Sequence, residues 1–289
     1  MDIEALKCFL AVAETGSFSA AAQRIYLTQP AVSKRIAALE RELDRRLFDR
    51  LGRTVDLTEA GRALLPRAQA ILAELDDARR ALSNLSGRIT GPLRLATSHH
   101  IGLHRLPPAL RRFHRRFPEV ALDLAFMDSE MACQAVARGR IEFAVATLPE
   151  DTGPPLVTEL IWEDPLEIVV GRDHPLAALK RPGREVLLEY PALLPGPGTV
   201  TRGLILAAFG PAREHVQPGM TTNYLEVLKM LAATGLGWSA LPHTMIDATL
   251  KVIHIDGMSI QRRLGLVRHA GRTLSNAAIA MIDIIRADP

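Results

Sequence analysis

The apolar residues at the start of the chain recur at helical spacing. The first set, which predicts one buried helical face, consists of Leu6, Phe9, Leu10 and Ala13. Gly16 ends this helix, and Ser17 or Ser19 can cap a second one. After a short break, Thr28 can cap a third helix, with Pro30 in the first turn, where its missing N–H costs no hydrogen bond.

The third helix combines an apolar stripe with polar residues near its start. The stripe, at spacings of 4, 3 and 4, is expected to be buried and consists of Val32, Ile36, Leu39 and Leu43. The polar residues include Gln29, Ser33, Lys34 and Arg35. This layout is typical of a helix-turn-helix, whose second helix presents its N-terminal side chains to base edges in the major groove. The alternative is a small helical domain whose basic residues are only solvated.

Two further features follow this third helix. Residues 47–57 predict an extended pair that turns around Gly52, a wing with Arg53 near its tip, where Arg can enter a minor groove or bind phosphate. Thr58 can then cap a helix that runs to about residue 86. At 1.5 Å per residue, its ~28 residues would be ~42 Å long.

Along that long helix, apolar residues alternate at spacings of 4 and 3, as in a coiled-coil seam. The seam consists of Leu64, Ala68, Ile71, Leu75, Ala78, Leu82 and Leu85. A dimer joined through this helix would hold two reading heads at a fixed separation. The alternative is a surface helix that packs on its own domain.

The rest of the chain alternates strands and helices. Strands are expected at 93–98, 120–127, 143–148, 156–171, 192–194 and 238–241, and helices at 103–117, 129–138, 201–209, 224–234 and 274–287. This alternation predicts an α/β fold with a mostly parallel sheet and helices on both faces. Its roughly 200 residues allow two similar lobes.

In such folds ligands bind at the carboxyl ends of strands, beside helix N-termini. The candidate residues at these positions are Thr97, Ser98, His99, His100, Ser129, Gly196, Thr199 and Thr222. Hydroxyls and free N–H groups at a helix start favour a small anion, and the two histidines could make binding pH-dependent. The alternative is that each residue only caps its own helix.

Composition narrows the classes of protein. The 289 residues are 48% apolar and carry a net charge of +3, which excludes a disordered, collagen-like or multi-span membrane chain. Residues 24–53 hold 8 basic and 4 acidic residues, a local excess of +4 over the predicted helix-turn-helix. The acidic start lacks a signal-peptide pattern, and the two cysteines suit a reducing compartment, so a cytoplasmic protein without a membrane partner is expected.

Signals for an enzyme are poor. His100 and His104 are four residues apart, as in a helical metal pair, but the pattern indicates no third ligand. The chain has no P-loop, no GxGxxG and no GxSxG. We therefore expect no catalytic residues, no metal and no cofactor.

The chain resembles the LysR-type transcriptional regulators over its whole length. The most specific stretches, which match in order and spacing, are Ser17–Ala22, Leu27–Ser33, Leu47–Arg50 and Leu57–Gly61. Weaker matching pieces are Leu106–Pro108, Arg116–Pro118, Gly139–Ala144 and Gly235–Pro242.

The resemblance implies a winged helix-turn-helix at 1–58, a linker and dimerisation helix at 59–87, a hinge at 88–92 and an effector-binding domain at 93–289. That domain is expected to resemble periplasmic binding proteins, with lobe I at about 93–162 plus 267–289 and lobe II at about 163–266. The DNA-binding residues carried over are Gln29, Pro30, Ser33, Lys34, Arg35 and Arg53. Lys34 stands where the family often has Arg, and Lys cannot form the bidentate fork to guanine.

The resemblance implies a regulator that binds an interrupted palindromic promoter site on double-stranded DNA and responds to a small-molecule effector in its C-terminal cleft. The hydroxyls and histidines at the helix starts favour a small anion as that effector. The resemblance further implies a homotetramer and contact with RNA polymerase. The alternatives are a solute-binding protein of the transport type, a DNA-binding regulator without an effector, and an enzyme with an accessory DNA-binding domain.

Overall fold

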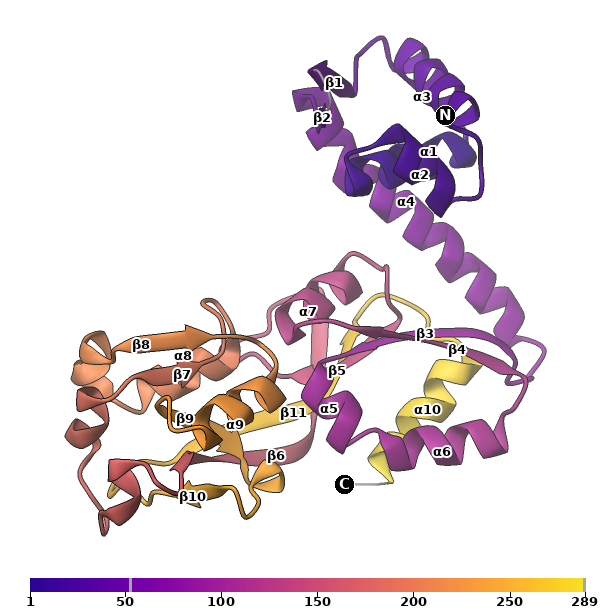
Figure 1. The fold of residues 1–289 in the computed structure, drawn as a ribbon. Helices are drawn as coiled ribbons and strands as arrows, with labels where there is room; N and C mark the ends of the chain where they lie inside the picture. The colour runs from indigo at the N-terminus through magenta and orange to yellow at the C-terminus, as the bar shows by residue number, and fades with distance from the viewer. Residues whose placement is uncertain (52–53, 288–289) are drawn as a thin grey trace. The chain divides into compact units, whose positions relative to one another are not determined.

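The computed structural model describes residues 1–51 and 54–287, so Gly52 and Arg53, the predicted tip of the wing, lie outside the described residues. The described chain divides into two units (Figure 1). The first holds Met1–Ser86 with Arg138–Arg140, and the second holds Gly87–Ala137 and the residues from Ile141 onward. None of the described helices combines the length and hydropathy of a membrane span.

The first unit is mainly helical. Its elements are α1 (Ile3–Thr15), α2 (Phe18–Arg24), α3 (Gln29–Leu43), β1 (Phe48–Leu51), β2 (Thr54–Leu57) and α4 (Glu59–Asn84). The predicted caps are confirmed: the hydroxyls of Ser17, Thr28 and Thr58 accept from backbone N–H groups at the starts of α2, α3 and α4. Gly16 ends α1 in the left-handed region, at φ +61°, which favours glycine.

Helices α1, α2 and α3 share one core with the start of α4. Phe9, Val32 and Ile36 are fully buried in it, and Leu39 is 1% exposed. The prediction for Leu43 is wrong, because its side chain is 37% exposed. Leu43 is the last residue of α3, and Asp44 turns the chain at φ 50°, so the stripe extends one turn beyond the core that covers it.

The predicted wing is confirmed as an antiparallel pair. β1 and β2 pair from Phe48–Leu57 to Leu51–Thr54. Behind the wing, α4 packs closely against the chain at Gly61. A Cβ there would lie 2.2 Å from the carbonyl oxygen of Leu47, so only glycine fits.

The second unit alternates strands and helices. Its strands are β3 (Gly91–Thr97), β4 (Val120–Phe126), β5 (Phe143–Thr147), β6 (Leu156–Gly171), β7 (Ala192–Leu194), β8 (Pro218–Thr221), β9 (Trp238–Pro242), β10 (Leu250–Val252) and β11 (Ile260–His269). Its α-helices are α5 (His99–His104), α6 (Pro107–Arg116), α7 (Ser129–Ala137), α8 (Val200–Ala207), α9 (Leu225–Ala233) and α10 (Asn276–Arg286). Short 3-10 helices are η1 (Pro175–Ala178), η2 (Arg184–Glu189), η3 (Gly210–His215) and η4 (His243–Met245).

The helix expected at 103–117 is two helices. α5 ends at His104 and α6 begins at Pro107. Pro107 and Pro108 have no N–H to donate, so they fit the first turn of α6, where that hydrogen bond is not needed, and could not lie further along a continuous helix.

The strands form one mixed sheet in the order β4-β3-β5-β11-β6-β9-β7-β8, with β10 also paired to β6. The expectation of a mostly parallel sheet is wrong. β3 pairs in parallel with β4 and β5, and β7 with β8 and β9. β6 and β11 pair antiparallel with each other and with their further neighbours, β9, β10 and β5.

Two lobes result, because β6 and β11 run through both halves of the sheet (Figure 1). On one side of the sheet, β3, β5, α6 and α10 share a core that includes Trp162 of β6 and Leu264 of β11. A separate core includes Leu166 of β6 and Ile260 of β11, together with residues of β7 and α8. Helices α7 and α9 cover the opposite faces, which confirms helices on both sides of the sheet.

Candidate functional site

The first candidate site is the start of α3, where Thr28 caps the helix and Pro30 occupies its first turn. Gln29, Pro30 and Lys34 are exposed, and Ser33 is half-buried. The amide Nε2 of Gln29 donates to the hydroxyl of Ser33 over 3.0 Å, so the two lie side by side one turn apart. We call these four residues the reading face.

Arg35 has a different environment. Its guanidinium lies 3.8 Å from the carboxylate of Asp2 and 3.9 Å from that of Glu4, at the start of α1. The side chain is 38% exposed. Arg35 therefore faces two acids of its own unit, whereas Lys34 points its charge to solvent. Arg53 lies outside the described residues.

Pattern reasoning overlooked Tyr26, which lies in the break between α2 and α3. Its side chain is 96% exposed, and its backbone takes the left-handed region at φ 56°. Such a conformation is uncommon for a bulky residue. The only signal in the sequence was an aromatic residue two positions before the cap Thr28, in a chain where aromatics make up 4%.

The second candidate site is a cavity of about 50 Å³ in the sheet unit, which we call the cleft. It is lined by Ser98, His99, His100, Asp128, Ser129, Glu130, Thr147, Pro195, Thr199, Thr201, Asn223, Leu225 and Arg262. Five of the eight residues expected at an effector site therefore meet here, from the starts of α5, α7 and α8. A water molecule needs roughly 10–15 Å³ of such space, so the cleft has room for only a very small ligand.

The other three expected residues do not line the cleft. Thr97 is fully buried, and its hydroxyl donates to the carbonyl of Ser98 over 3.4 Å. The N–H of Gly196 donates to the Oδ1 of Asn223 over 2.7 Å, and the hydroxyl of Thr222 accepts from the N–H of Tyr224 over 3.3 Å. None of these contacts caps a helix: Thr97 and Thr222 bond to neighbours one or two residues away, and Gly196 bonds to Asn223, 27 residues further along the chain.

Acidic side chains cross the cleft from the segment after β4. A carboxylate oxygen of Glu130 accepts from the N–H of Val200 over 2.7 Å, at the N-terminus of α8. Asp128 accepts from the side-chain amide of Asn223 over 2.7 Å. Both acids flank Ser129, the predicted residue, but only the fold brings the start of α8 and Asn223 to them.

A buried ion pair lies beside the cleft. Arg262 is 4% exposed and Asp164 1% exposed, and Arg262 donates through Nε, over 2.9 Å, and through Nη2 to one carboxylate oxygen. Arg105 donates to the other oxygen over 3.2 Å. Burial lowers the pKa of the Arg262 guanidinium, and the Asp164 charge opposes that shift. The remaining nitrogen of Arg262 donates to the hydroxyl of Thr201 over 3.4 Å.

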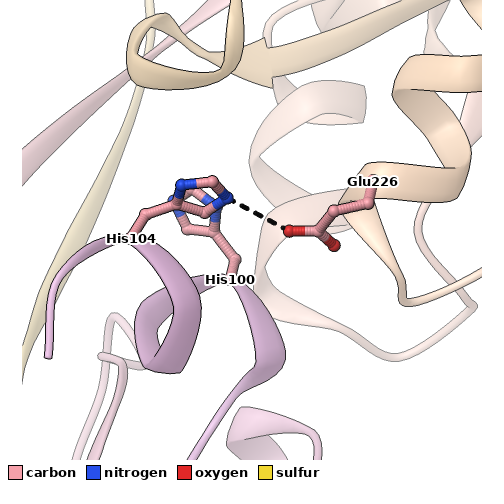
Figure 2. Close-up of side chains that lie close together, drawn as sticks. All are labelled: His100, His104 and Glu226. Carbon is pink, nitrogen blue, oxygen red and sulfur yellow. Dashed lines mark hydrogen bonds and ion pairs between the residues drawn. The ribbon is translucent and has the colours of Figure 1, made fainter. Parts of the chain in front are cut away.

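Three side chains at one edge of the cleft form a separate cluster. His100 and His104 lie on α5, with ring centroids 4.9 Å apart, and Nε2 of His104 lies 3.3 Å from Oε1 of Glu226 on α9 (Figure 2). Burial, followed by the charge of Arg262, lowers the pKa of His100 to about 3, so its ring is neutral near pH 7. The sequence pattern indicates no third partner for the histidine pair; the fold brings Glu226 of α9 to it, 122 residues from His104 along the chain.

Two protein families match the chain. Residues 3–62 match the family described as "Bacterial regulatory helix-turn-helix protein, lysR family". Residues 86–288 match the family described as "LysR substrate binding domain". The two matches fall on the helical unit with its wing and on the sheet unit.

Individual relatives agree with the family matches. A probable RuBisCO transcriptional regulator of Cyanidioschyzon merolae is 31% identical over 286 residues, covering 96% of this chain and 94% of the relative. An HTH-type transcriptional regulator in the ibpB-leuC intergenic region of Azotobacter vinelandii is 72% identical over 108 residues, 37% of this chain and 75% of the relative. Full-length CbnR, in complex with its target DNA, has a similar fold, with a TM-score of 0.68, 21% identity and full coverage of both chains.

Proposed function

The chain belongs to the LysR family of bacterial regulators, and on this premise we propose how it recognises DNA and which class of effector it senses. It is a DNA-binding transcriptional regulator with an effector-binding domain, from a family of regulators and not of enzymes. The match of residues 3–62 to a DNA-binding family opposes the alternative of a transport-type solute-binding protein.

We propose that a dimer, joined along α4, reads the two halves of an interrupted palindrome and that dimers pair into tetramers. Leu64 and Leu75 of the seam are half-buried in the single chain, and Ala68 is fully buried. From the middle of α4 to its C-cap, Ile71, Leu82 and Leu85 are 39%, 70% and 83% exposed. A second copy of α4 would cover these side chains, as the heptad spacing requires.

We propose that the reading face contacts base edges and that Arg53 contacts the DNA backbone or a minor groove. The observation that supports this is the exposed amide of Gln29 beside the Ser33 hydroxyl in the first turns of a capped helix. An amide can bond bidentately to adenine, and a hydroxyl can bond to any base edge. Lys34 adds a positive charge without the planar fork of Arg. Arg35 contributes less than these three, because Asp2 and Glu4 face it.

Replacement of Gln29 by Ala tests the base contact. We expect the dissociation constant for the operator to rise roughly 5- to 150-fold, which corresponds to the loss of the 1–3 kcal/mol of one good bidentate contact. The dissociation constant for random DNA should change little. Fluorescence anisotropy on an operator selected from random duplexes, and on a scrambled duplex of equal length, measures both constants.

The control for this test is Gln134→Ala, which removes an exposed glutamine from α7 in the other unit. It should leave both dissociation constants unchanged. An equal loss on operator and scrambled DNA with Gln29→Ala contradicts base reading, because phosphate contacts do not depend on sequence.

For the effector, we propose a small anion at the N-terminus of α8. The observation that supports it is the Glu130 carboxylate, which already accepts from Val200 N–H at this helix end, beside the Thr199 cap. This contact supports an anion at the site, since helix N-termini carry unpaired donors and a partial positive charge. An effector carboxylate or oxyanion would replace Glu130 and release the segment after β4.

Glu130→Ala tests this competition. The variant frees the Val200 N–H, so small anions should stabilise it more than they stabilise the unmodified protein. The readout is the midpoint of thermal unfolding, measured by the fluorescence of Trp162 and Trp238. The probes are acetate, succinate, phosphate and sulfate. A ligand of the folded state at 100 times its dissociation constant adds about 2.7 kcal/mol to the free energy of unfolding. Glu119→Ala, which removes an exposed glutamate of the same unit, is the matched control.

A second candidate is a regulator without an effector. The small size of the cleft favours it. Glu130 already accepts from the N–H of Val200, and Asp128 from the side-chain amide of Asn223, so a cavity of only about 50 Å³ remains. If none of the four anions shifts the midpoint of either Glu130→Ala or the unmodified chain, the anion proposal is wrong and this candidate remains.

A further inference from the structure

The cluster of His100, His104 and Glu226 has the composition of a metal site. The two histidines are one helical turn apart on α5, and their rings face the Glu226 carboxylate from α9 (Figure 2). One ligand atom from each residue lies within 4.8 Å of the others. A tetrahedral ion with bonds of about 2.0–2.1 Å holds its ligand atoms about 3.3 Å apart. The 3.3 Å between His104 Nε2 and Glu226 Oε1 already has this value.

An independent observation points to a ligand at this place. His100 is 3% exposed, and neither of its ring nitrogens hydrogen-bonds to any residue within 1–51 or 54–287. Buried polar atoms almost always have a partner, and leaving one without costs on the order of 1–3 kcal/mol. The His100 ring lies 4.9 Å from the His104 ring, centroid to centroid, and is tilted by 37° to it. A group bound by both histidines would give His100 the partner that the described residues do not.

We propose that His100, His104 and Glu226 bind one divalent first-row transition-metal ion, with zinc as the reference ion. Two imidazole nitrogens and one carboxylate oxygen suit Zn²⁺, Co²⁺ or Ni²⁺ and leave a position for water or a ligand. Ca²⁺ and Mg²⁺ prefer all-oxygen ligands, so they are not expected to bind here. His104 is 35% exposed and Glu226 37% exposed, which leaves the ion a path from solvent.

The charges around the cluster are compatible with a cation. Arg262 and Arg105 are positive groups whose charges act on His100, and both hydrogen-bond to Asp164. Asp164 offsets one of their charges, and Glu226 adds a second negative charge within the cluster itself. The ligand set therefore stays close to neutral before the ion enters.

Binding of an ion would link the two lobes of the sheet unit. Ile101 anchors α5 in the core around β3 and β5, whereas Leu225 and Leu228 anchor α9 in the core that contains β9. Ser98, His99 and Leu225 from the same segments line the cleft. An ion held by both helices would restrain the lobes next to the effector cleft, so metal occupancy would regulate the domain independently of the anion proposed above.

The test is metal binding by the full chain after chelator treatment. Co²⁺ is the probe, because its visible absorption reports nitrogen and oxygen ligation directly, and Zn²⁺ competition gives the affinity. We expect one ion per chain. The dissociation constant should be at least about tenfold higher for Glu226→Gln and for His104→Ala, because even the loss of a group that only hydrogen-bonds to a ligand lowers metal affinity by about 10- to 100-fold. His114→Ala, which removes an exposed histidine of α6, should bind like the unmodified chain.

Two results would overturn the proposal. One is the absence of Co²⁺ absorption and of any Zn²⁺-induced rise in the unfolding midpoint of the unmodified chain. The other is equal affinity in the unmodified chain, Glu226→Gln and His104→Ala, which would place the ion on other histidines. Both variants change partly exposed side chains, and their midpoints in chelator show whether they fold normally. Neither result bears on DNA or anion binding, which are measured without metal.

Discussion

Replacing Asp164 by Asn is expected to lower the free energy of unfolding of the sheet unit by about 3–5 kcal/mol, the usual cost of removing one partner from a buried ion pair. Arg262 is 4% exposed and directs two donors at the Asp164 carboxylate, and Arg105 directs a third. An Asn side chain keeps the shape but removes the negative charge. The two guanidinium groups would then repel each other without compensation.

The measurement is denaturant unfolding followed by tryptophan fluorescence. Both tryptophans of the chain, Trp162 and Trp238, lie in the sheet unit and are at most 6% exposed, so their signal reports this unit alone. Asp123→Asn is the matched control, because the Arg94–Asp123 pair has side chains 61% and 53% exposed. Exposed pairs contribute about 0–1 kcal/mol.

Two outcomes separate the explanations. A loss below about 1 kcal/mol for Asp164→Asn, equal to that of the control, contradicts the buried-pair interpretation. The double variant Asp164→Leu with Arg262→Met should recover much of the stability, because an apolar pair of similar volume carries no desolvation cost. Failure to recover would indicate that Arg105, which keeps its charge, dominates the effect.

The second large effect is expected for Leu82→Asp in α4. Leu82 is 70% exposed in the single chain, so the change should not disturb the fold of a monomer. In a dimer it would place two carboxylates in the apolar seam. We expect monomers by light scattering and an operator affinity lower by about 100-fold or more, the gain that linking two binding modules provides.

Ser83→Asp introduces the same charge one residue away, off the seam, and should leave both the mass and the operator affinity unchanged. An unaltered dimer mass with Leu82→Asp contradicts the seam. Binding to a single half-site should be the same for Leu82→Asp and the unmodified chain, because the reading face on α3 is untouched.

The helical unit was predictable because its signals are local. The caps Ser17, Thr28 and Thr58 bond to N–H groups three residues away, and Gly16 stops its own helix. A pattern of a few residues contains all the information that such contacts need. The exposed Leu43 shows the limit: spacing marks a helical face, but burial depends on what packs against it.

Most elements of the sheet unit were predictable, but the strands β8, β10 and β11 were not expected, and the predicted parallel pairing was wrong. Residues 260–269 were not expected to be a strand, because Arg262 occupies a buried position where alternation calls for an apolar residue. Arg262 fits there only because Asp164, 98 residues earlier, lies on the neighbouring strand. Without that strand, the antiparallel centre of the sheet could not be derived from the pattern.

The candidate sites divide in the same way. The reading face comes from one helix, so the positions of Gln29, Pro30, Ser33 and Lys34 followed from residue spacing and a family resemblance. The cleft and the histidine cluster are built from several segments, among them α5, α7, α8 and α9. No local sequence pattern identifies Glu130, Arg262 or Glu226 as residues of these sites. Contacts within one helix depend on neighbours three or four residues away, whereas contacts between lobes depend on how distant strands pair within one sheet. The sequence by itself therefore determines the local helices and their caps, whereas the chemistry of the cleft arises only when distant segments pack together.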